Sequence, residues 1–168
     1  MPTRRKKNRA ELLEYLAQGR ERLLSAIEGL SEEEVTISGV VGDWSVKETL
    51  AHIAAWDKET RAVIERAISQ EHPKFDYTIR GVRGFAKWNA QEIEKRRAMS
   101  TSHILAEMEE AREGLIELTR QLSDEELSRR FVPPWRWPTT PRRNLEIQAE
   151  HDIEHADQIM AWQRKRQA

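Results

Sequence analysis

The stretch GDWSVKETLAHIAAWD, residues 42–57, decides the fold of this chain and contains its first candidate ligand. Ser45, followed three residues later by Glu48, forms a capping box, in which each side chain accepts a hydrogen bond from the other residue's backbone N–H. Apolar residues then recur at helical spacing, and His52 falls at the edge of their face. We therefore predict a long amphipathic helix over residues 46–69, with one histidine beside the core.

Caps and apolar stripes continue on both sides of this helix. Leucines and isoleucines form one stripe over residues 9–30, and we expect Arg20 to lie outside that stripe. Residues 70–84 are irregular, and a helix resumes near residues 82–85. The helical period then falters at residues 99–102, which is compatible with one kinked helix or with two separate helices.

Shorter signals complete the predicted architecture. Ser31 and Ser123 each open a capping box of one short turn, and Thr140 followed by Pro141 opens a last helix to about Gln163. Four long helices make an up-down bundle the default all-α architecture. We expect residues 1–8 to be a disordered basic N-terminus and residues 9–168 to be a single helical bundle domain.

Composition excludes several classes of function. The 168 residues carry a net charge of −1, which argues against bulk electrostatic capture of nucleic acid. No apolar run approaches ~20 residues and no apolar leader is present, so we expect a cytoplasmic protein without a membrane span. The chain has no cysteine. Any transition metal must therefore be held by His, Asp or Glu, and any thiol chemistry needs a thiol cosubstrate.

The last helix carries an unusual polar strip beside its apolar face. Gln148, His151, Asp152 and His155 stand at positions i, i+3, i+4 and i+7. Two histidines four residues apart project from one helix face and reach one metal ion, although two surface histidines show the same spacing. Asp152 needs a partner if it is buried. It is a candidate general base or ligand-orienting group, or the partner of an arginine at the core edge, and Gln148 is a candidate substrate contact.

His52 gives the histidine pair a third member. A lone histidine at a core edge is ordinarily a satisfied structural residue, but three histidines at matching flank positions point to a shared ion. Three imidazoles leave coordination positions open, as catalytic sites do, and they suit Zn, Ni, Fe or Cu. Glu48 is better explained by its cap than by chemistry. Trp44 is expected to pack the start of its helix against the preceding loop.

Aromatic residues suggest where a substrate would bind. Trp56 comes one turn after His52, and Trp135 and Trp137 stand in a proline-stiffened loop before the last helix. We expect these three indoles to line a pocket beside the histidines. His72 and His103 have no partner at useful spacing and are expected to be exposed.

The pattern Trp44-Ser45-x-x-Glu48-x-x-x-His52-Ile53-x-x-Trp56, with His151-x-x-x-His155 far downstream, resembles the DinB/YfiT-like superfamily. The Trp88-Asn89 pair, the segment at residues 122–127 and the tryptophan-rich loop look most like its ClbS/DfsB branch. This resemblance implies an up-down-down-up bundle and frequent dimerisation. It also implies a divalent metal, zinc or nickel, held by the three histidines.

Characterised relatives in that superfamily include thiol-dependent transferases and isomerases, and ClbS is a toxin-protection hydrolase. The resemblance implies the ligands but no particular reaction. From the three histidines and Asp152 we hypothesise a metal-dependent enzyme, a hydrolase or thiol-dependent transferase, whose ion activates water or a thiolate cosubstrate against a small-molecule substrate. An alternative is a ClbS-like protection protein that sequesters a toxin or ligand while the metal is dispensable. A third hypothesis, in which the basic termini bind DNA, has less support because the chain is close to neutral.

Overall fold

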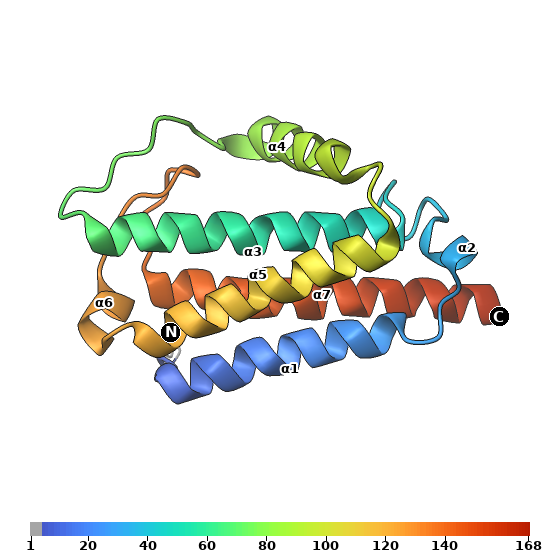
Figure 1. Ribbon diagram of the computed structural model, residues 1–168, viewed down its shortest axis with the longest axis horizontal. Coiled ribbons are helices and arrows are strands. Elements are labelled where there is room, and N and C mark those ends of the chain that lie inside the picture. The colour runs from blue at the N-terminus through green and yellow to red at the C-terminus, as the bar shows by residue number, and fades with distance from the viewer. Residues whose placement is uncertain (1–4) are drawn as a thin grey trace.

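The computed structural model describes residues 5–168, which form seven helices around a bundle core (Figure 1). All three predicted capping boxes are present, and in each the Ser and Glu side chains accept from each other's backbone N–H groups. Within residues 5–168 no β-strand occurs, only two isolated bridges. The helices are α1 Arg9–Ile27, α2 Glu32–Val35, α3 Val46–Ser69, α4 Gly81–Arg96, α5 Thr101–Gln121, α6 Asp124–Ser128 and α7 Pro141–Gln167.

The four long helices α1, α3, α5 and α7 run up, down, down and up, as the family resemblance implies (Figure 1). The default up-down order is therefore wrong. The reason is α4, which carries the chain back along the outside of the bundle to the end where α3 begins. As a result α5 starts beside the start of α3 and runs parallel to it. The interruption at residues 99–102 separates two helices rather than kinking one.

Helix α7 extends beyond the predicted end at Gln163 and reaches Gln167. Its last turn contains three basic residues, which the partial negative charge of a helix C-terminus favours. One of them, Arg166, also forms an ion pair with Glu34 at 3.1 Å. Both contacts favour a helical conformation in this last turn.

Helices α1 and α7 pack closely because a glycine faces the contact. A Cβ atom on Gly19 would lie 2.8 Å from the backbone oxygen of Ala149. Apolar clusters fill the bundle on both sides of this region, one around Leu50 and Met108 and one around Leu16 and Leu115. No helix in the described part of the chain is long and apolar enough to cross a bilayer.

A layer of four charged residues separates the two apolar clusters. Arg20 from α1, Asp57 from α3, Arg112 from α5 and Asp152 from α7 are all buried, with exposed fractions of 5 %, 0 %, 2 % and 0 %. Each guanidinium lies within 3.1 Å of a carboxylate oxygen of both aspartates. Two positive and two negative charges thus compensate one another inside the core.

Arg20 was expected outside the apolar stripe, and this expectation is wrong. Its side chain is buried because Asp57 and Asp152 accept from it, both at 2.9 Å, and the backbone oxygen of Met108 accepts at 2.9 Å. Buried arginine is tolerated where its donors are satisfied in this way.

Candidate metal centre

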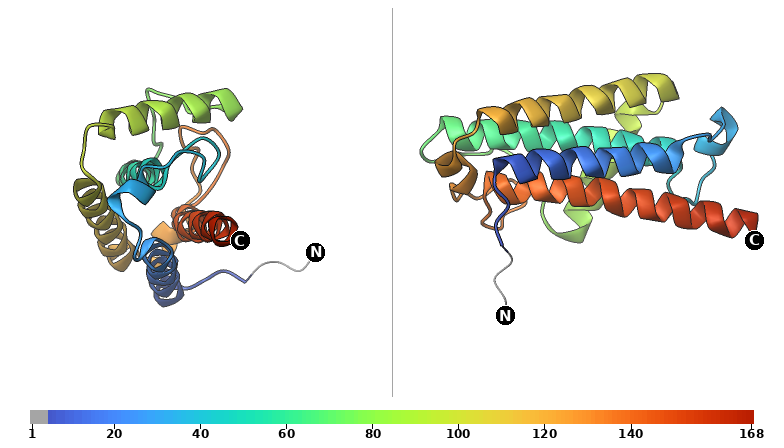
Figure 2. Two further views of the ribbon diagram at one scale, coloured as in Figure 1. Left: turned by 90° about the vertical axis from the view of Figure 1, so that its right-hand side faces the viewer. Right: turned by 90° about the horizontal axis from the view of Figure 1, so that it is seen from below.

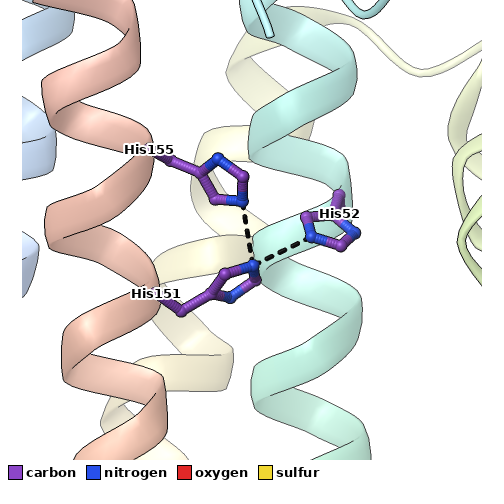
Figure 3. A group of neighbouring side chains, drawn as sticks. All are labelled: His52, His151 and His155. Atoms are coloured by element: carbon purple, nitrogen blue, oxygen red, sulfur yellow. Dashed lines mark hydrogen bonds between the residues drawn. The ribbon is translucent and has the colours of Figure 1, made fainter. Parts of the chain in front are cut away.

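Three histidines from two helices meet at one point in the middle of the bundle (Figure 3). His52 comes from α3, and His151 and His155 come from successive turns of α7. The Nε2 atom of His151 lies 2.9 Å from Nε2 of His52 and 2.9 Å from Nε2 of His155. Within residues 5–168 the group contains these histidines and no carboxylate.

Hydrogen bonding fixes the orientation of one ring. The Nδ1 atom of His155 lies 2.7 Å from the side-chain oxygen of Gln158. Because a carboxamide oxygen only accepts, Nδ1 carries the proton and Nε2 of His155 presents a lone pair to the cluster. This arrangement is the one that a metal-binding histidine needs.

The three nitrogens do not satisfy one another. Nε2 of His151 faces two other ring nitrogens, and a single N–H there serves only one of them well. Two of the three pairs of ring nitrogens are 2.9 Å apart, and all three nitrogens lie within 4.8 Å of one another. Nitrogens bound to a tetrahedral zinc ion at ~2.0–2.1 Å stand ~3.3 Å apart, which falls within this range. The donor set therefore fits a divalent transition metal, and small ring rotations suffice to accept it.

Burial keeps these imidazoles neutral. It lowers the pKa of His52 to about 3, assisted by the neighbouring His155, while the Asn89 side chain acts in the opposite direction. Burial also lowers the pKa of His151 well below its ordinary value, and it lowers that of His155. At pH 7 all three rings are thus uncharged, the form that binds a metal ion.

Asp152 and Glu48, which were considered for the site, contact structural partners instead. Oδ2 of Asp152 is 2.9 Å from Arg20 and 3.1 Å from Arg112, so this carboxylate belongs to the charged layer. Glu48 accepts from the backbone N–H of Ser45 at 2.9 Å, which completes the predicted cap.

Two further predictions concern rings outside the cluster. The ring of Trp44 packs against that of His52, with centroids 4.8 Å apart. His72 and His103 are exposed, as expected.

A cavity of about 240 Å³ opens beside His52 and His151. It is enclosed by α3, α4, α7 and the loop before α7, and Trp56, Trp135 and Trp137 all line it, as does Gln148. Helix α4 supplies part of the wall and stands apart from the four long helices in the end view (Figure 2). The three indoles that were expected at a pocket thus line one cavity, and α4, for which no part was predicted, contributes to its wall.

Sequence reasoning missed five residues of this pocket and three of the charged layer. Asp57, Arg20 and Arg112 fall at apolar-stripe spacing, and a charged residue at such a position is a signal that could have been read. Thr60 likewise falls two turns after His52 on α3. The missed pocket residues are Thr60, Phe85, Asn89, Asn144 and Ile147.

The loop that carries Trp135 and Trp137 is held in an unusual backbone conformation. Arg136 between them has φ of 72°, in the left-handed region that disfavours residues with a Cβ. Its N–H donates to Pro133 O at 2.9 Å, and Ile79 N–H donates to Pro134 O at 3.0 Å. These bonds hold the loop backbone on either side of Trp135.

Comparison with solved structures gives the same fold at low sequence identity. The colibactin self-resistance protein ClbS, solved in complex with a dsDNA, has a TM-score of 0.77 at 13% identity over 92% of this chain and 94% of its own. YfiT from Bacillus subtilis, described as a probable metal-dependent hydrolase with an unusual four-helix bundle topology, has a TM-score of 0.75 at 19% identity over 98% and 91%.

A third similar structure is an enzyme of greater length. The mycothiol-dependent maleylpyruvate isomerase has a TM-score of 0.75 at 14% identity, covering 91% of this chain and 61% of the isomerase. No protein with a curated description matches the sequence. A family model for the DinB superfamily matches residues 3–159, almost the whole chain. This chain therefore belongs to the DinB superfamily.

Proposed function

We propose that this protein is a metal-dependent enzyme in which His52, His151 and His155 hold a divalent ion, zinc or nickel. The reaction we propose is hydrolysis of a small molecule or transfer of a thiol to it. The observation that carries this proposal is the meeting of three Nε2 atoms beside a cavity. A homodimer and a cytoplasmic location stay predictions.

A divalent ion held by three imidazoles lowers the pKa of a water or thiol and polarises an electrophile. The residues around it would do the rest. Gln158 orients His155, and the packing of Trp44 restricts the ring of His52. Because His52 and His151 line the cavity, the open side of the site would face the bound substrate.

We assign Asp152 a positioning role rather than that of a general base. Its Oδ2 atom is already bonded to two guanidinium groups, and the residue is not part of the cavity wall. Asp152 follows His151 directly, so its ion pairs anchor the turn of α7 that carries both histidines. Gln148, which does line the cavity, remains our candidate for a substrate contact.

The test begins with metal content. Protein purified without a nickel column should contain about one zinc or nickel ion per chain, and His155→Ala should lose it. His103→Ala is the matched control, because that histidine is exposed and distant from the cluster in sequence. A wild type that contains no metal and gains no thermal stability from zinc or nickel would overturn the proposal.

Activity is then measured with two generic probes: p-nitrophenyl acetate for hydrolysis and 1-chloro-2,4-dinitrobenzene with a small thiol for transfer. We expect one reaction to exceed the rate given by the variant that lacks all three histidines. The alternative is a protection protein that sequesters a ligand. It is supported by the similar fold of ClbS and predicts instead that protection of cells survives loss of the three histidines.

A further inference from the structure

Helix α4 brings one polar side chain to the cavity, that of Asn89. The other α4 residue in the cavity wall is Phe85, one helical turn earlier. The ring of Phe85 lies against that of Trp56 with centroids 5.7 Å apart, and the ring of Trp88 contacts the same indole at 4.2 Å. These ring contacts hold α4 against α3, so they fix the position from which Asn89 reaches the cavity.

The orientation of the Asn89 carboxamide follows from its bond with Trp56. The indole Nε1–H donates to the side-chain oxygen Oδ1 of Asn89 at 2.9 Å. Because an indole nitrogen only donates, the carboxamide must turn its oxygen toward Trp56. Burial lowers the pKa of His52, whereas Asn89 acts to raise it, as an acceptor near that ring does. Both neighbours therefore face the oxygen of this side chain.

The NH2 group of Asn89 is left without a partner inside the protein. Within residues 5–168 the hydrogen bonds of this side chain use its oxygen alone. Asn89 is only partly buried and belongs to the cavity wall. The other asparagine of the wall, Asn144, is 2 % exposed, and its NH2 group donates to Thr139 Oγ1 and Thr140 O. Asn89 therefore has two N–H donors available to a molecule in the cavity.

The position of Asn89 beside the histidines gives these donors a chemical role. Asn89, His52 and His151 line the same cavity, and Asn89 is near enough to His52 to affect its pKa. A ligand group bound beside His52 is therefore close to the free NH2 group as well. Side-chain amides that donate to an oxygen stabilise it as it gains negative charge during a reaction. A carbonyl oxygen is the ligand group that such a donor suits.

We propose that Asn89 binds the substrate through a hydrogen bond from its NH2 group to a carbonyl oxygen. Trp56 is the positioning residue that holds the carboxamide in the required orientation. The substrate class is then a carbonyl compound, such as an ester, an amide or an enone, and these are electrophiles that water or a thiol attacks. The inference rests on the proposed function, because it names the substrate class of that same site.

Two uncharged probes of the same shape test the inference. Acetophenone has a carbonyl oxygen, and α-methylstyrene has a CH2 group in its place. Calorimetry measures the affinity of both on protein of known metal content. Asn89→Asp keeps an acceptor for Trp56 but loses both donors, and Asn89→Leu loses donors and acceptor without adding a charge. We expect the ratio of ketone to alkene affinity to fall about three- to tenfold in both variants.

The matched control is Gln91→Glu on the same helix. It makes the same change from amide to acid at an exposed position of α4, and it should leave the ratio unchanged. The wild type adds a measurement that needs no variant. The chain has three asparagines, so isotopic labelling of asparagine nitrogen gives three side-chain NH2 signals in NMR spectra. Acetophenone should shift the Asn89 signal downfield, and α-methylstyrene should not.

A role for Asn89 as nothing more than the acceptor for Trp56 predicts that Asn89→Asp has the wild-type ratio. That result would overturn the inference, as would an Asn89 signal that does not respond to acetophenone, or no acetophenone binding at millimolar concentration. Metal content separates this inference from the proposed function. A metal-free protein with the ketone-specific shift would refute the proposed metal site and leave the carbonyl-binding role of Asn89 standing.

Discussion

Replacing Arg112 by methionine removes one of the two cations from the charged layer at the centre of the bundle. The side chain is 2 % exposed and donates to both carboxylate oxygens of Asp57, at 3.0 and 3.1 Å. It also lies 3.1 Å from Asp152 and donates to the backbone oxygen of Leu16 at 3.0 Å. Methionine retains most of the packing of the stem and none of these bonds.

Without Arg112, two buried aspartates would share Arg20 as their only cation in the layer. Removing one partner of a buried pair costs ~3–5 kcal/mol, because a charge is left uncompensated. In a chain of this size each kcal/mol lowers the Tm by ~2–4 °C, so we expect a decrease of about 6–20 °C. Thermal and urea unfolding followed by circular dichroism measure this change.

The matched control is Arg120→Met on the same helix. That side chain is 61 % exposed and pairs with Glu117 on the surface, where ion pairs contribute ~0–1 kcal/mol. Combining Arg112→Met with Asp57→Asn should recover part of the loss, because the double variant has a balanced layer. If Arg112→Met lowers the Tm no more than Arg120→Met does, the charge-compensation argument is refuted.

Three further predictions concern packing, backbone strain and pH. Gly19→Ala should destabilise the protein by ~1–3 kcal/mol, because the new Cβ would meet the Ala149 backbone. In the control Gly114→Ala the new Cβ meets only the flexible Arg61 side chain, so this variant should be neutral or more stable by up to ~1 kcal/mol. Denaturant unfolding compares the two variants. Arg136→Gly should be ~1 kcal/mol more stable than Arg136→Ala in the same assay, since only glycine accepts a φ of 72° without strain, and equal stabilities would contradict the strain argument. Burial raises the pKa of Glu59, while the Tyr77 hydroxyl that donates to it acts in the opposite direction. Because the folded state holds the carboxyl proton more tightly than the unfolded state does, folding stability decreases as pH rises above 4.5. The Tm of Glu59→Gln minus that of the wild type should therefore be larger at pH 7 than at pH 4. A larger difference at pH 4 would contradict a raised pKa for Glu59.

The helices could be predicted from the sequence because helix caps and apolar spacing depend on residues that are close together in the chain. The Ser45–Glu48 capping box marks the start of one helix without reference to the rest of the chain. The N-cap Thr140, followed by Pro141 at the first helical position, does the same for another helix. The spacing of His151 and His155 likewise fixes their common face. His52 joined them by its flank position and by the family resemblance, and the structure brings all three rings together.

Other features depend on how the helices are arranged. The spacing of Arg20 places it at the core, but its partners, Asp57 and Asp152, lie on other helices, so the ion pairs themselves cannot be predicted from spacing alone. The return of α5 parallel to α3 follows from where α4 packs, which the irregular residues 70–84 do not encode locally. The unpaired hydroxyl of Thr60 becomes visible only when its surroundings are known.

His52, His151 and His155 are proposed to bind one divalent ion through their ring nitrogens. X-ray absorption at the zinc edge of protein loaded with one equivalent of zinc tests it most directly. We expect three imidazole nitrogens at ~2.0–2.1 Å from the zinc ion in the wild type, and two in His52→Ala. A shell made of oxygen ligands, or a spectrum unchanged by His52→Ala, would contradict it.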